Sequence, residues 1–229
     1  MNYGLQFMSI SWTDGIKENE AIMIVREVHV ALRQALMYLP SPTSIVTLPA
    51  VKPFGNWVLQ DVEPNSTYGS TQWYIDQSYD RESGRLLGRQ YLNIVLNEPF
   101  QSVTPHFDLA VTHYPLLDEV LNREVIGVDI PGRAAVLSNA PLNGVDRKYD
   151  RPIVLRRIIS HYVGRVIGLP FHNHGSSCRC VDVCAMRPAD TLEEWVDLAQ
   201  EEFAQDCIYC DSCRRELSAR IASNQLGLN

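Results

Sequence analysis

Hydrophobic and polar positions follow two different periods at the start of the chain. Between residues 8 and 12 apolar side chains alternate with polar ones, which is typical of a half-buried strand, and Asp14-Gly15 marks its end. Over 18–39 apolar residues recur every three or four positions, which predicts a long amphipathic helix. Pro40 stops this helix, because proline cannot continue the helical hydrogen bonding.

The same two periods predict further elements along the chain. Short apolar runs between turn residues predict strands at 44–51, 57–62, 71–75, 107–112, 124–130 and 134–138. Helical spacing predicts helices over 82–97, 151–168, 191–205 and 212–221. Helices interleaved with strands are typical of a layered α/β fold, here a mixed sheet with helices.

Length, composition and charge exclude several classes of protein. The 229 residues, of which 45% are apolar, fit a single domain over 1–229. No apolar stretch approaches the roughly 20 residues that cross a bilayer, and residues 1–9 lack an export pattern. We therefore expect a cytoplasmic protein with no membrane partner. The net charge of −7 also argues against nucleic acid as a partner, because phosphate contacts need local positive charge.

All cysteines are confined to one short stretch. The first 177 residues contain none. In a reducing compartment such a cluster favours metal thiolates over disulfides, so we expect zinc and divide the domain into 1–177 and a cysteine zinc-binding module at 178–217. The six residues are Cys178, Cys180, Cys184, Cys207, Cys210 and Cys213.

A longer motif surrounds the end of the helix at 151–168. Residues 161–172 read HYVGRVIGLPFH, and they are followed by Cys184-Ala-Met186 and by Cys210-Asp-Ser-Cys213. These residues resemble the archaemetzincins, zinc metallopeptidases that carry H-E-x-x-H-x-x-G-x-x-H-C, then C-x-M, then C-x-x-C. Matching segments at 88–91, 107–109 and 132–138 extend the resemblance over at least residues 80–217. The resemblance implies a metzincin-like fold.

The motif departs from the family at the residues that perform the chemistry. Two histidines four residues apart on a helix bind one zinc, and the glutamate beside the first activates the metal-bound water. This chain keeps His161 but has Tyr162 at the general-base position and Arg165 at the second ligand position. A phenol is a poor base near neutral pH, and a guanidinium has no lone pair for a metal. The third ligand position falls on Phe171, with His172 beside it.

Three interpretations of this helix remain open. The first is a pseudopeptidase that has no intact catalytic residue and in which Arg165 fills the place of the zinc. The second is an active zinc metallopeptidase with a rearranged site of His161, His172 and His174 and another carboxylate as base. The third assigns these histidines no ligand role. Whether the chain is an enzyme stays open, and a second, catalytic zinc is expected only under the second interpretation.

By resemblance, four cysteines would hold a structural zinc ion. The positions that match the family are Cys184, Cys210 and Cys213. The fourth family position falls on residue 179, an arginine, so Cys180 or Cys178 must replace it. Cys207 forms an alternative C-x-x-C pair with Cys210.

Two further expectations follow from the resemblance. Met186 occupies the position of the methionine that lies beneath the catalytic metal in metzincins. A retained cleft beside lost chemistry also favours a binding protein, which would hold an extended peptide or a small ligand by strand addition.

Overall fold

A five-stranded mixed sheet forms the centre of the protein. The computed structural model describes residues 7–39, 47–56, 70–145, 150–171 and 183–226. The strand order is β2 (Ala50–Gly55), β1 (Phe7–Trp12), β5 (Phe107–Thr112), β9 (Ala134–Ser138) and β8 (Gly127–Ile130). The first four strands run parallel, and β8 pairs antiparallel with β9 at one edge.

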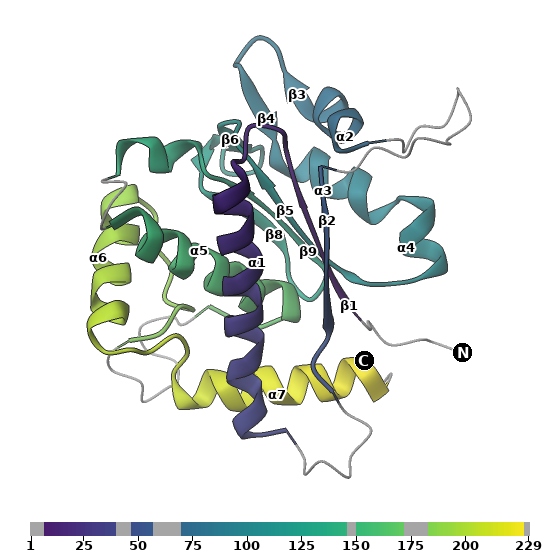
Figure 1. Ribbon diagram of the computed structural model, residues 1–229. Helices are drawn as coiled ribbons and strands as arrows, with labels where there is room; N and C mark the ends of the chain where they lie inside the picture. The colour runs from purple at the N-terminus through teal and green to yellow at the C-terminus, as the bar shows by residue number, and fades with distance from the viewer. Residues whose placement is uncertain (1–6, 40–46, 57–69, 146–149, 172–182, 227–229) are drawn as a thin grey trace.

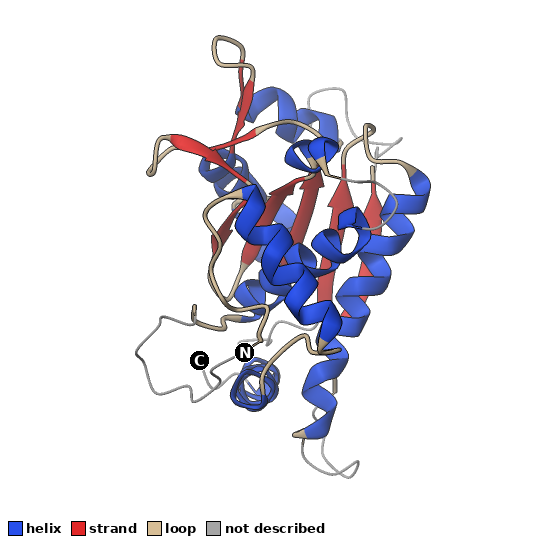
Figure 2. Ribbon diagram, turned by 90° about the vertical axis from the view of Figure 1, so that its left-hand side faces the viewer, coloured by secondary structure: helices blue, strands red, loops and turns tan. Residues whose placement is uncertain are grey.

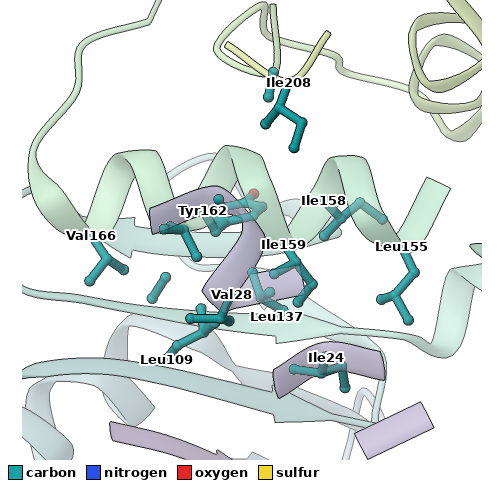
Figure 3. Close-up of a cluster of buried hydrophobic side chains, with 14 of the residues drawn as sticks. Ile24, Val28, Leu109, Leu137, Leu155, Ile158, Ile159, Tyr162, Val166 and Ile208 are labelled. Atoms are coloured by element: carbon teal, nitrogen blue, oxygen red, sulfur yellow. The ribbon is translucent and has the colours of Figure 1, made fainter. Parts of the chain in front are cut away.

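Helices cover both faces of this sheet. Helices α1 (Glu18–Arg33) and α5 (Asp150–Ile167) lie against one face, and α3 (Gly88–Leu96) lies against the other (Figure 1). Because successive side chains of a strand point to opposite faces, Leu109 of β5 packs with the α1–α5 core, whereas Ala110 packs with the α3 core. Figure 3 shows the first core, in which apolar side chains of α5 meet those of α1, β5 and β9.

A smaller sheet lies beyond the carboxyl end of the main one. Its order is β3 (Tyr79–Asp80), β4 (Arg85–Leu87), β6 (Leu116–Asp118) and β7 (Arg123–Val125). Two of its hairpins project from the body of the molecule (Figure 2). The other elements are η1 (Gln34–Met37), α2 (Thr71–Ser78), α4 (Pro99–Val103), η2 (Ala140–Gly144), α6 (Leu192–Ala204) and α7 (Asp211–Leu226).

The predicted layered α/β class is confirmed, and so are the elements with the strongest periodicity. The strands at 107–112 and 134–138 and the helices at 151–168 and 191–205 match β5, β9, α5 and α6 to within a residue or two. The first helix is shorter than predicted, because the chain tightens into η1 after Arg33. The last helix is longer, since α7 continues to Leu226. Among the described helices, none is long and apolar enough to span a bilayer.

The predicted strand at 71–75 is wrong, because these residues begin helix α2. Ser70 caps the helix by accepting a hydrogen bond from the backbone N–H of Trp73. Thr71, Tyr74, Ile75 and Ser78 are the buried positions, which is helical spacing. The aromatic and β-branched residues suggested a strand, but their burial follows the 3.6-residue period.

Three other predicted elements are displaced or divided. The helix predicted over 82–97 starts only at Gly88, because Arg85–Leu87 is a strand of the small sheet, joined to β3 by a turn at Gly84 with φ +70°. The strand predicted at 124–130 is divided at Ile126 between β7 and β8, which belong to different sheets. The strand predicted at 44–51 begins at Ala50 instead, in register with Phe7. The strand predicted at 57–62 lies outside the described residues.

A buried ion pair joins α5 to α6. Arg157 is 1% exposed, and its guanidinium donates to Glu202 of α6 and to the backbone carbonyl of Arg187, the latter at 2.7 Å. Its charge also lies 5.1 Å from the ring of Trp195. Because a buried charge is costly without its counterion, this pair fixes how α6 packs on α5.

We expect Glu202→Ala to lower the free energy of unfolding by about 3–5 kcal/mol, because it leaves the charge of Arg157 buried and unpaired. Urea denaturation followed by circular dichroism measures this change. Glu216→Ala is the matched control, since it breaks the exposed pair with Arg220 and should change stability little. Equal effects of the two substitutions would contradict the role given to Arg157.

Candidate functional site

A cleft of about 650 Å³ runs along the edge of the main sheet. Its walls come from the edge strand β8, the hairpin β6–β7, helix α5 and the segment that leads into α6. Three motif positions line it: His161, Tyr162 and Arg165. Phe171, which follows the turn at the end of α5, lines it as well. The motif and the cleft therefore form one candidate site.

His161 is buried in the protein and held in one orientation. Its Nδ1 lies 2.6 Å from the backbone carbonyl of Ala185, so Nδ1 carries the proton of the neutral ring. Burial lowers the pKa of His161 to about 3, and the charges of Arg157 and Arg165 act in the same direction. The imidazole is therefore neutral at physiological pH. Trp195 packs edge-on against its ring with centroids 5.2 Å apart.

The other two ligand positions are occupied by a stacked pair. The ring of Phe171 stacks on His161 with centroids 5.6 Å apart, and the guanidinium of Arg165 lies 3.9 Å from the centre of the Phe171 ring. Arg165 also makes an ion pair of 2.9 Å with Asp129 of β8 and donates to the carbonyl of Leu169 at 2.7 Å. The turn at Gly168, with φ +104°, brings Phe171 back toward the helix. Positive charge and an aromatic ring therefore stand where two zinc ligands would be expected.

Tyr162 is directed at the edge strand. Its hydroxyl donates to the backbone carbonyl of Gly127 at 2.9 Å. Its ring stacks on that of Trp195, with the ring centroids 6.3 Å apart and an interplanar angle of 17°. Burial raises the pKa of the Tyr162 phenol further above its usual value. A group that holds its proton so firmly cannot accept one from water near neutral pH.

Sequence reasoning did not anticipate the partners of these residues. Asp129, Gly127 and Trp195 each complete a contact with the motif, but they lie 34 to 36 residues from their partners. The acidic residue of β8, upstream of a helix that carries an arginine among apolar residues, was the available signal. His172 and His174 of the rearranged-site interpretation lie outside the described residues.

Three cysteines gather in the protein interior, and none of them lines the cleft. The sulfurs of Cys184, Cys210 and Cys213 all lie within 4.8 Å of one another, and all three side chains are buried. Cys207 is not in this group: its Sγ lies 3.5 Å from the carbonyls of Val183 and Tyr209. Cys178 and Cys180, the candidates for a fourth ligand, lie outside the described residues.

The chemistry of this cysteine cluster suits a metal cation. Hydrogen bonding with Cys210 raises the pKa of Cys184 to about 12, and hydrogen bonding with Cys184 raises the pKa of Cys213 as well. Three adjacent thiols cannot all ionise unless a cation compensates their charge. Buried thiolates at this spacing are the donor set that structural zinc prefers, and the backbone N–H of Cys213 already points at the sulfur of Cys210.

One short segment links the cysteine cluster to the cleft. Cys184 belongs to the cluster, and the carbonyl of the next residue, Ala185, holds His161. Met186 is buried against α5, where a Cβ added to Gly164 would lie 2.5 Å from its sulfur. The carbonyl of Arg187 holds Arg157, and the chain then enters the wall of the cleft at 188–192.

Comparison with known proteins supports the metzincin-like fold. The sequence matches no protein-family model, and no curated protein matches it either. Among solved structures, an archaemetzincin from Methanopyrus kandleri superposes with a TM-score of 0.61 at 18% identity, covering 95% of this chain and 96% of that one. An archaemetzincin from Archaeoglobus fulgidus, complexed with malonate, gives a TM-score of 0.51 at 15% identity, covering 90% of this chain and 96% of the other.

A zinc-dependent peptidase from Methanocorpusculum labreanum gives a TM-score of 0.51 at 13% identity, covering 92% of this chain and 99% of that peptidase. Identities this low establish the fold and leave the activity to be argued from the site. The resemblance first seen in the motif at 161–172 is thus confirmed at the level of the fold: the chain has the fold of the archaemetzincins.

Proposed function

We propose that this protein is a non-hydrolytic relative of the archaemetzincin peptidases, which keeps a structural zinc and binds an extended peptide in the old substrate cleft. The observation that carries the proposal is the stack of His161, Phe171 and Arg165. The guanidinium of Arg165 is paired with Asp129, so the positive charge of Arg165 is fixed beside the position that a catalytic zinc would need.

The loss of chemistry follows from the residues that replace the ligands and the base. A cation near Arg165 would meet electrostatic repulsion, and Phe171 offers no lone pair. Tyr162 keeps its proton, and its hydroxyl donates a hydrogen bond to the backbone carbonyl of Gly127. Loss of the general base alone costs roughly 10²- to 10⁴-fold in rate, before any loss of metal.

Cys184, Cys210 and Cys213 would hold the structural zinc, with a fourth ligand from the chain. Zinc bound to these thiolates would cross-link the segment that contains Cys184 to the start of α7. None of the three cysteines lines the cleft, so this role is compatible with a cleft that performs no hydrolysis.

The edge strand supports a peptide as the ligand. β8 pairs with β9 on one side, and its other side contributes Gly127, Val128 and Asp129 to the cleft wall. An open strand edge binds extended peptides through main-chain hydrogen bonds. Apolar side chains across the cleft, including Leu192 and Trp195, would contact side chains of the peptide.

Protein purified without chelator is expected to contain one zinc ion per chain, because the thiol cluster forms a closed structural site. Cys213→Ser should release the zinc and lower the melting temperature, since metal binding contributes to folding. Elemental analysis and calorimetry measure both. Cys207→Ser is the matched control and should keep its zinc. If Cys213→Ser retained full zinc content, the assigned site would be wrong.

We expect zinc-loaded protein to cleave a quenched fluorescent peptide library no faster than its His161→Ala variant, because neither has a base or a complete set of ligands. The rate of fluorescence increase measures cleavage. Zinc-dependent cleavage that disappears in His161→Ala would instead support the rearranged site with His172 and His174. Elemental analysis of the same two proteins should give equal zinc content.

A further inference from the structure

The backbone of β8 presents two residues to the cleft. In an antiparallel pair, the N–H and C=O groups of successive residues point alternately toward the partner strand and away from it. The carbonyl of Ile126 accepts from the N–H of Ser138 at 2.7 Å, on the side of β9. The polar groups of Gly127 and Asp129 therefore point outward. These are the groups to which an added strand would bind.

One of these outward groups already has a partner within the protein. The carbonyl of Gly127 accepts the hydrogen bond from Tyr162. The tyrosine ring also lies directly against the strand, because a Cβ added to Gly127 would be 2.5 Å from the ring carbon Cζ. Glycine at this position is what allows so close an approach. Trp195 stacks on the same ring and helps to hold it there.

We propose that Tyr162 is a gate for peptide binding: its hydroxyl occupies the carbonyl of Gly127 at which a peptide N–H would bind. The inference rests on the proposed binding function. A peptide must either displace the phenol or pair with β8 from Asp129 onward. The residue that replaces the general base thus sets which register of peptide the edge strand accepts.

Selective isotope labelling tests the contact. Gly127-Val128 and Gly144-Val145 are the two Gly-Val pairs of the sequence, so ¹³C′-glycine with ¹⁵N-valine gives two carbonyl cross-peaks in an HNCO spectrum. In Tyr162→Phe the Gly127 carbonyl should shift upfield as its hydrogen bond is lost, whereas Gly144 stays in place as the internal control. An unchanged Gly127 resonance would overturn the proposal.

Fluorescence polarisation tests the gate. The probe is a fluorescein-labelled, end-capped heptapeptide library without cysteine, titrated against wild type, Tyr162→Phe and Tyr114→Phe. Tyr162→Phe should bind roughly three- to tenfold more tightly, the value of one hydrogen bond released for the ligand. Tyr114 does not line the cleft, so Tyr114→Phe should bind like wild type.

The outcomes separate the two proposals. Equal affinity of wild type and Tyr162→Phe would overturn the gate and leave peptide binding standing. No binding by any of the three proteins would overturn peptide binding and the gate with it. Tighter binding by Tyr114→Phe as well would show that loss of a phenol acts nonspecifically, and this would also overturn the gate.

Discussion

Helix α5 is enclosed by the main sheet, α1, α6 and α7, and this enclosure constrains the large polar side chains that it buries. Thirteen of its eighteen residues are buried. A polar group removed from water must find a partner inside the protein, because an unsatisfied one costs several kcal/mol. Four side chains of α5 find theirs on four residues of three neighbouring segments: a carboxylate of α6, the carbonyl of Ala185, and the carbonyl of Gly127 and the carboxylate of Asp129 in β8. The residues concerned are Arg157, His161, Tyr162 and Arg165.

The same constraint explains how the cleft side of this helix finds its partners within the protein. In a zinc peptidase the metal would accept the lone pairs of the histidines that face the cleft. Here Arg165 brings its own charge, and Asp129 balances it from the adjacent strand. Phe171 fills the remaining space between the guanidinium and His161. The substituted residues thus form a connected set of contacts, in which the carboxylate of Asp129 balances the charge of Arg165.

The sequence predicted what depends on local pattern and missed what depends on distant contacts. The period of α5, the replacement of the general base by Tyr162 and of a zinc ligand by Arg165, and the grouping of the cysteines were all visible in the chain. The strand predicted at 71–75 failed because residue type suggested a strand, whereas the buried positions follow the helical period of α2. The contacts of Asp129 and Gly127 with α5 could not be predicted, because strand register decides which backbone groups face the helix.

The segment from Cys184 to Arg187 joins these features, and its length matters as much as its composition. In four consecutive residues it supplies a thiol to the cysteine cluster, a carbonyl to His161, a thioether packed on Gly164 and a carbonyl to Arg157. Inserting or deleting one residue would displace the contacts beyond it by about 3.5 Å, more than a hydrogen bond tolerates. This irregular stretch therefore has the low tolerance to length variation of a core strand, although it lies between helices where loops ordinarily vary most freely.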